Sequence, residues 1–125
     1  MLSIDNSPWS IDKKQRMHLS SFPFSITDFS TIAPEIKKGV TGFAEWRTLF
    51  RDETRIRLVT YSPGYLADHW CSKGHILFCV EGEMETELEN GSKHLLTKGM
   101  MYTVGDNADA HRTYSKDGCV LFIVD

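Results

Sequence analysis

The feature that most constrains the fold is the segment from Pro63 to Gly91, where turn signals enclose alternating apolar and polar residues. The segment follows a turn at residues 62–64 and closes with Asn90-Gly91, a dipeptide with a strong preference for tight β-hairpins. Apolar positions alternate with acids before this hairpin: Met84, Thr86 and Leu88 against Glu83, Glu85, Glu87 and Glu89. A strand with this alternation has one face in a core and the other in water. The segment therefore predicts a β-meander.

The same pattern of short strands continues on both sides of this segment. Alternating or continuously apolar runs occur at residues 41–50, 55–61, 92–96, 100–104, 111–115 and 119–124. Turn formers separate them, and we interpret Glu81-Gly82-Glu83 as a turn between two strands. The only helical signal is one short turn at residues 32–36. Short strands at regular intervals predict an all-β barrel or sandwich with little helix.

Length and charge exclude several classes of partner. A chain of 125 residues is expected to form one domain, and a net charge of −3 argues against nucleic acid as a partner. Four arginines alternate with acids in a pattern typical of a solvated face: Arg47, Arg51, Arg55 and Arg57. We expect a polar tail over residues 1–20 and one folded domain over 21–125. Because no run has the length of a membrane span and no signal-peptide core is present, we expect no membrane partner, a cytoplasmic location and reduced cysteines.

Potential metal ligands gather at the start of the central segment. His69, Cys71 and His75 lie within seven residues, and His69 and Cys71 share one face if the chain is extended there. His75 shares a face with Leu77 and Cys79. Each of these ligand types also occurs as a simply buried residue, and Cys71 fits a small hydrophobic packing role about as well. Cys79 and Cys119 lie in apolar strands and are expected in the core. Tyr61, Tyr65, Tyr102, Arg112 and Tyr114 could line a cavity rim, although each alone is more typical of a structural role.

These residues resemble the motifs of the cupin superfamily, which consists of small β-barrels. Gly64 and the turn at Gly82 match the two ends of the first cupin motif, and His69, Cys71 and His75 fall on its His, His and Glu positions. Gly99 and His111 match the second motif. The run from Asp68 to Cys71 resembles a narrower family of cupin-fold proteins named for an Asp-His-Cys-Trp (DHCW) motif, although here Trp70 precedes Cys71. The resemblance implies a double-stranded β-helix, the jelly-roll cupin barrel.

The resemblance also implies a metal in the barrel. His69, His75 and His111 would bind a divalent transition metal, with Cys71 as a possible fourth ligand, and imidazole suits Zn, Fe, Ni and Cu alike. One hypothesis is a metalloenzyme, oxygenase-like or isomerase-like, that acts on a small molecule. The alternative is a non-catalytic module that binds a small ligand or senses a metal. No acid-base residue stands out, because the four glutamates before the hairpin are expected to face outward.

Aromatic residues near the N-terminus predict an interaction surface. Trp9, Phe22, Phe24 and Phe29 lie in a segment too irregular to form its own core. If exposed, they would form an apolar patch of the kind that marks an interface. We therefore expect a homodimer that buries this patch across a twofold axis. The alternative is that the segment folds back on its own barrel as a lip.

Overall fold

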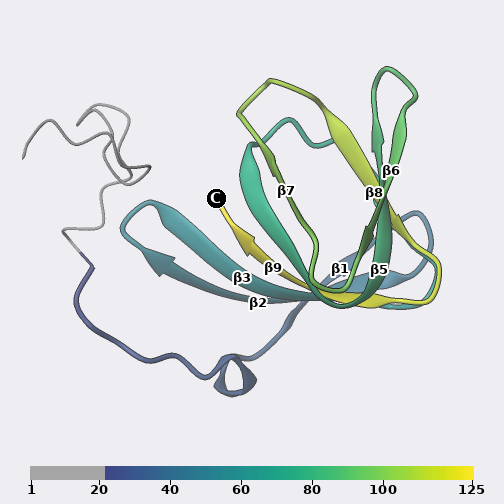
Figure 1. The fold of residues 1–125 in the computed structure, drawn as a ribbon. Coiled ribbons are helices and arrows are strands. Elements are labelled where there is room, and N and C mark those ends of the chain that lie inside the picture. The colour runs from purple at the N-terminus through teal and green to yellow at the C-terminus, as the bar shows by residue number, and fades with distance from the viewer. Residues whose placement is uncertain (1–21) are drawn as a thin grey trace, which may run out of the picture.

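The computed structural model describes residues 22–125, so the predicted polar tail and Trp9 lie outside the described residues. The described part is almost entirely β-structure, with strands that curl around a common interior (Figure 1). Hydrogen bonding connects them in the order β1-β2-β3-β9-β5-β8-β4, with β6 and β7 also paired to β5. The strands are β1 (Glu35–Lys38), β2 (Phe43–Arg51), β3 (Thr54–Tyr61), β4 (Tyr65–Leu66), β5 (His75–Leu88), β6 (Lys93–Thr97), β7 (Met101–Val104), β8 (His111–Ser115) and β9 (Cys119–Val124).

Strand β5 connects the two sides of the barrel. Its first half pairs with β7 and β9, and its second half pairs with β6 and β8. The register with β9 shifts between Cys79 and Glu81, and Gly82 has a φ of 75°. A Cβ at Gly82 would lie 2.5 Å from the carbonyl oxygen of Gly118, so glycine is required on steric grounds as well. The predicted turn at residues 81–83 is therefore wrong, because a bulge and a glycine bend the strand without ending its pairing.

The predicted helical turn at residues 32–36 is also wrong. A 3-10 helix, η2 (Phe29–Thr31), comes earlier, where the Asp28 side chain accepts a hydrogen bond of 2.9 Å from the Ser30 amide. Residues 35–38 form β1 instead, antiparallel to β2. Pro34 favours this outcome, because proline disfavours helical conformation in the residue before it. The description of the fold as all-β with little helix is confirmed, and among residues 22–125 no helix is long and apolar enough to cross a membrane.

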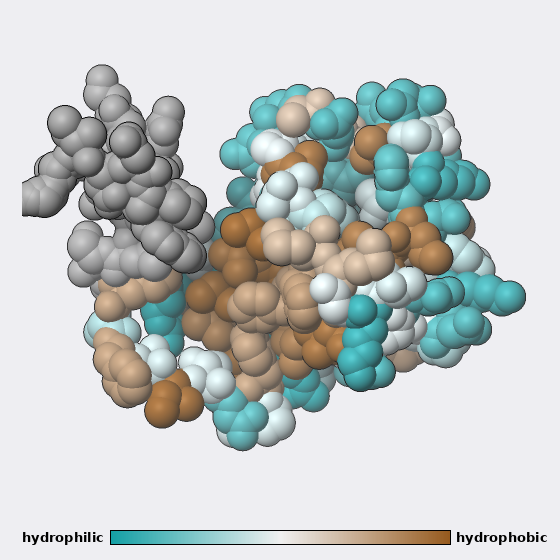
Figure 2. Space-filling model, in the orientation of Figure 1, coloured by the Kyte–Doolittle hydropathy of each residue, from teal (hydrophilic) through white to brown (hydrophobic). Residues whose placement is uncertain are grey.

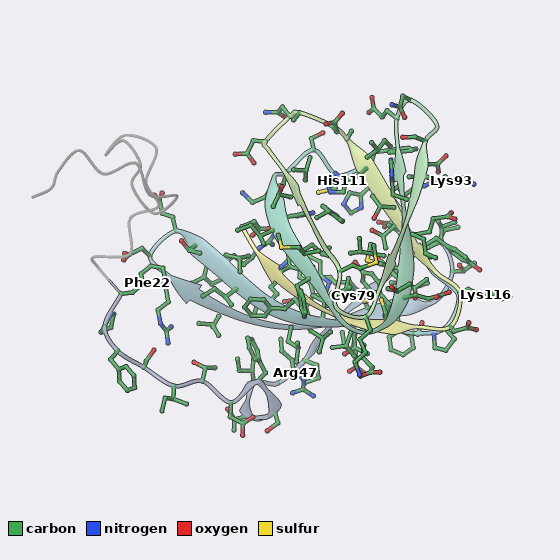
Figure 3. The ribbon with its side chains drawn as sticks, viewed as in Figure 1. Phe22, Arg47, Cys79, Lys93, His111 and Lys116 are labelled. Carbon is green, nitrogen blue, oxygen red and sulfur yellow. The ribbon has the colours of Figure 1, made fainter. Side chains whose placement is uncertain are left out.

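The interior follows the predicted alternation. Val59, Leu77, Cys79, Met84 and Leu121 are almost fully buried and come from both sides of the barrel. Cys79 lies among them near the base of the barrel (Figure 3). Cys119 is buried as well, as expected, and burial raises the pKa of its thiol to about 11. Burial raises the pKa of Cys79 as well, so both thiols are protonated at neutral pH and contribute as packing groups.

The outer face of β9 and its neighbouring strands is apolar. Hydrophobic residues gather over this part of the barrel in Figure 2, and Ile76, Phe78 and Val80 all remain partly exposed. The segment before β1 covers some of it, because Phe29 packs edge-on against Phe122 with ring centroids 6.3 Å apart. Phe24, in contrast, is 93% exposed. The segment thus packs Phe29 on its own barrel and leaves Phe24 uncovered.

Candidate functional site

A cavity of about 290 Å³ lies between the two sides of the barrel. Its walls combine three kinds of side chain: the aromatic rings of Trp46 and Tyr102, the imidazoles of His75 and His111, and the guanidinium of Arg57. The inward faces of β2, β3, β5, β7 and β8 supply them, because side chains alternate along each strand. The site therefore depends on the closure of the barrel rather than on any single segment.

His75 and His111 meet inside this cavity. Each is the first residue of its strand, β5 and β8, and the Nε2 atoms of the two rings are 3.1 Å apart. His111 is 4% exposed and lies in the upper part of the barrel (Figure 3). The Tyr102 hydroxyl lies 3.1 Å from the same Nε2 atom of His75. Residues that are 36 positions apart in sequence thus place two imidazole nitrogens at one point.

Hydrogen bonds orient the two rings. Nδ1 of His111 donates to the carbonyl oxygen of Asp109 at 2.9 Å, which leaves a lone pair on its Nε2. Nδ1 of His75 is buried without a hydrogen-bond partner, and the nearest charged atom is Oδ2 of Asp125 at 3.7 Å. At 3.7 Å the two groups are close enough to interact electrostatically but do not form a hydrogen bond. Since the proton of His111 lies on Nδ1, a proton on Nε2 of His75 would complete the hydrogen bond between the two rings.

The electrostatic environment keeps His75 neutral. Burial and the neighbouring His111 lower the pKa of His75 to about 4, although Asp125 opposes this shift. At neutral pH the ring therefore has a free lone pair, which is the form that binds metals. Two nitrogens bound to one metal at 2.0–2.1 Å, at angles between octahedral and tetrahedral, are separated by about 2.8–3.4 Å. The observed separation of 3.1 Å falls within this range.

The structure does not group the other two predicted ligands, His69 and Cys71, with the His75–His111 pair. The side chain of His69 is 72% exposed, and its Nδ1 donates to the Asp68 carboxylate at 2.6 Å. Cys71 is partly buried and lines the same cavity. The extended strand expected across these two residues is not formed; residues 67–74 make a loop that is tied to β8 by backbone hydrogen bonds between Cys71 and His111. Among residues 22–125, no three or more His, Cys, Asp or Glu side chains are grouped closely enough to hold a metal ion.

Sequence reasoning missed two charged residues behind the histidines. Arg57 was expected on a solvated face but is only 5% exposed, so that prediction is wrong for this residue. Asp125 has a side chain that is 1% exposed and accepts hydrogen bonds from Arg55 at 2.9 and 3.0 Å and from Arg57 at 3.0 Å. The alternation of β3 contained a usable signal, because Arg57 shares its face with Val59 and Tyr61. Asp125 is in phase with the buried residues Leu121 and Ile123 of β9, but the near-continuous apolar run of that strand hides the alternation in the sequence.

Comparison with known proteins supports the fold. No protein-family model and no curated protein matches the sequence. Among solved structures, ectoine synthase from P. lautus is 20% identical, with a TM-score of 0.65 over 81% of this chain and 76% of that one. A predicted oxalate decarboxylase from Thermotoga maritima is 18% identical, with a TM-score of 0.68 over 80% and 96%. An RmlC-like cupin from Shewanella frigidimarina is 20% identical, with a TM-score of 0.59 over 73% and 81%.

These similarities define the architecture. The chain is a cupin-fold jelly-roll barrel, as its motif spacing predicts. The structural neighbours include enzymes as well as cupins without a stated activity. Because their sequence identities to this chain are low, its chemistry has to be inferred from its own residues. The narrower resemblance to proteins with an Asp-His-Cys-Trp motif stays a prediction.

Proposed function

We propose that this protein binds a divalent transition metal in its barrel and acts as a metalloenzyme on a small molecule, with oxygenase-like or isomerase-like chemistry. The observation that carries the proposal is the approach of two imidazole Nε2 atoms to 3.1 Å. Without a metal this contact is a hydrogen bond in which Nε2–H of His75 donates to Nε2 of His111, and it leaves Nδ1 of His75 buried and unpaired. A metal would replace the shared proton between the two rings, and the proton of neutral His75 would then lie on Nδ1, on the side of Asp125.

His75 and His111 form the fixed part of the proposed ligand set, and the loop at residues 67–74 supplies the rest. His69 is exposed and its residue already lines the cavity, so its imidazole would reach the metal by a rotamer change that gives up the hydrogen bond to Asp68. Cys71 lines the same cavity from a position held against His111. Nitrogen ligands with one thiolate suit Zn, Fe, Ni or Cu. A metal held by three protein ligands keeps positions open for substrate, which it would polarise as a Lewis acid.

A second candidate function is a non-catalytic module that binds a small ligand or a metal. The residues available for proton transfer favour this second function, because no Asp or Glu is among the described residues that line the cavity. Burial raises the pKa of Tyr102 far above neutrality, so this hydroxyl donates hydrogen bonds but does not act as a base. Oxygen uptake and turnover, measured with candidate thiols and acids on metal-loaded protein, distinguish the two functions.

Elemental analysis of protein purified without chelator tests the metal site. We expect a transition metal that approaches one per chain after supplementation, and we expect His75→Ala to remove it. His94→Ala is the matched control, because His94 is exposed, lies outside this cavity and has its ring 3.2 Å from the Ser92 hydroxyl. If supplemented wild type binds no more metal than His75→Ala, the proposed site is wrong.

A further inference from the structure

We propose that the cavity recognises the carboxylate group of a small molecule, with Arg57 as the anchor and Arg55 beside it. This inference deepens the proposed function, and it rests on that proposal only for the use of the cavity as a ligand site. It is carried by the charges and unpaired donors of the cavity wall, which the metal site does not use.

The cavity wall has a surplus of positive charge in a chain whose net charge is −3. Arg55, Arg57 and Lys73 line it, whereas no acidic side chain does so among the described residues. Asp125 lies behind the two arginines and pairs with both, so one carboxylate serves two guanidinium groups. The charge of Arg112 has its own partner, because Glu87 lies 3.5 Å away. Among the side chains of the described residues, the two cations of the Arg55–Arg57 pair therefore share a single carboxylate.

The side chain of Arg57 has the surroundings of a ligand-binding group rather than those of a surface charge. It is 5% exposed, and its Nη2 donates to Asp125 at 3.0 Å, but its Nε is buried without a hydrogen-bond partner. Its guanidinium carbon lies 4.5 Å from the ring centroid of Trp46, which fixes the plane of the group. Burial and the adjacent Arg55 lower the pKa of Arg57, as expected for a cation with too little compensating charge. Buried donors of this kind are normally satisfied, and an anion that enters the cavity would gain a charge-assisted hydrogen bond from this one.

The ligand is small and carries a single negative charge. Asp125 Oδ2 is 3.0 Å from Arg57 and 3.7 Å from His75, so both residues lie within reach of one small molecule. The cavity volume of about 290 Å³ is at the lower end for ligand sites. A carboxylate adds one negative charge to the pair and matches the planar guanidinium fork, whereas a phosphate brings nearly twice the charge. When the carboxylate is bound at Arg57, the rest of the molecule extends toward the His75–His111 pair.

The test compares three probes on the full-length protein as purified: benzoate, benzamide and inorganic phosphate. Calorimetry is expected to show benzoate binding at least tenfold tighter than its neutral isostere benzamide and than phosphate. Arg57→Met is expected to weaken benzoate binding at least tenfold, and Arg57→Lys, which keeps the charge but loses the fork, is expected to weaken it measurably. Arg51→Gln is the control, because Arg51 lies at the far end of β2 and contacts Phe50 and Ser25; it is expected to bind benzoate as wild type does.

A measurement on the wild-type protein tests the inference even if the Arg57 variants fail to fold. The Nε–H resonance of Arg57 in ¹⁵N-edited NMR spectra is expected to shift on addition of benzoate and not of benzamide. Equal binding of benzamide, an unshifted Arg57 resonance, or folded Arg57 variants with unchanged affinity would each overturn the inference. Repeating the titration after chelator treatment separates the two proposals: Arg57-dependent benzoate binding by a protein that takes up no metal contradicts only the metal site. If metal-loaded protein does not bind benzoate, only the carboxylate site is contradicted.

Discussion

Asp125→Asn should destabilise the protein strongly, because it removes the only carboxylate that the described structure pairs with both Arg55 and Arg57. The Asp125 side chain is 1% exposed, whereas that of Arg55 is 26% exposed and can recover some hydration. Removing one partner of a buried ion pair costs about 3–5 kcal/mol. Since Arg55 is partly solvated, we expect a loss of about 3 kcal/mol, near the lower end of that range.

Urea unfolding followed by circular dichroism measures this loss. With a slope of about 2 kcal/mol/M, typical for a small domain, a loss of about 3 kcal/mol lowers the midpoint by about 1.5 M. Asp117→Asn is the matched control, since Asp117 is exposed and lies in the turn before β9, and it should change the stability by less than about 0.5 kcal/mol. If Asp125→Asn unfolds at the same urea concentration as Asp117→Asn, the role assigned to this ion-pair network is wrong.

The same network predicts the response to acid. Burial raises the pKa of Asp125, but the hydrogen bond from Arg55 and the charges of both arginines outweigh it, so the pKa in the folded protein is lowered overall. The unfolded chain therefore takes up this proton first as the pH falls. The stabilisation is fully present above the usual aspartate pKa of about 3.9 and is lost as the pH falls from there through the lowered value. Asp125→Asn should lack this part of the acid transition.

Two further predictions concern Cys71 and the oligomeric state. If Cys71 binds the metal, its thiolate should react slowly with an alkylating reagent until a chelator removes the metal, whereas equal rates with and without chelator would assign it a packing role. We propose that the chain is a homodimer through its N-terminal aromatic segment, where Phe24 is 93% exposed. Light scattering should show a dimer for the full chain and a monomer for a chain starting at Gly39; a full-length monomer at micromolar concentration would contradict this.

Much of the barrel could be predicted from the sequence because side-chain alternation is a local signal. Met84 and Thr86 face the interior and the adjacent glutamates face outward, as period-two alternation requires. The bend of β5 could not be predicted in the same way. Gly82 marks either a turn or a bulge in sequence, and only the pairing of β5 with β9 on one side and β8 on the other decides between them.

The site was predictable only in part, for a related reason. The spacing of His75 and His111 relative to their turns indicates two inward-facing imidazoles, and the structure brings them together. The same spacing predicts an inward-facing His69, but in the structure its side chain is exposed and hydrogen-bonds with Asp68. Arg57 and Asp125 are 68 positions apart, and no local pattern connects a buried cation with a distant buried anion. The cytoplasmic location and the boundary at residues 20–21 stay predictions.

The central claim is that one metal ion binds between His75 and His111. Anomalous diffraction at the absorption edge of the metal found by elemental analysis tests it most directly, on crystals grown with that metal and without chelator. We predict one strong anomalous peak per chain, at about 2.0–2.2 Å from Nε2 of both histidines. An occupied metal peak elsewhere, or metal-supplemented crystals whose Nε2 atoms remain in direct contact with no peak between them, would contradict the claim.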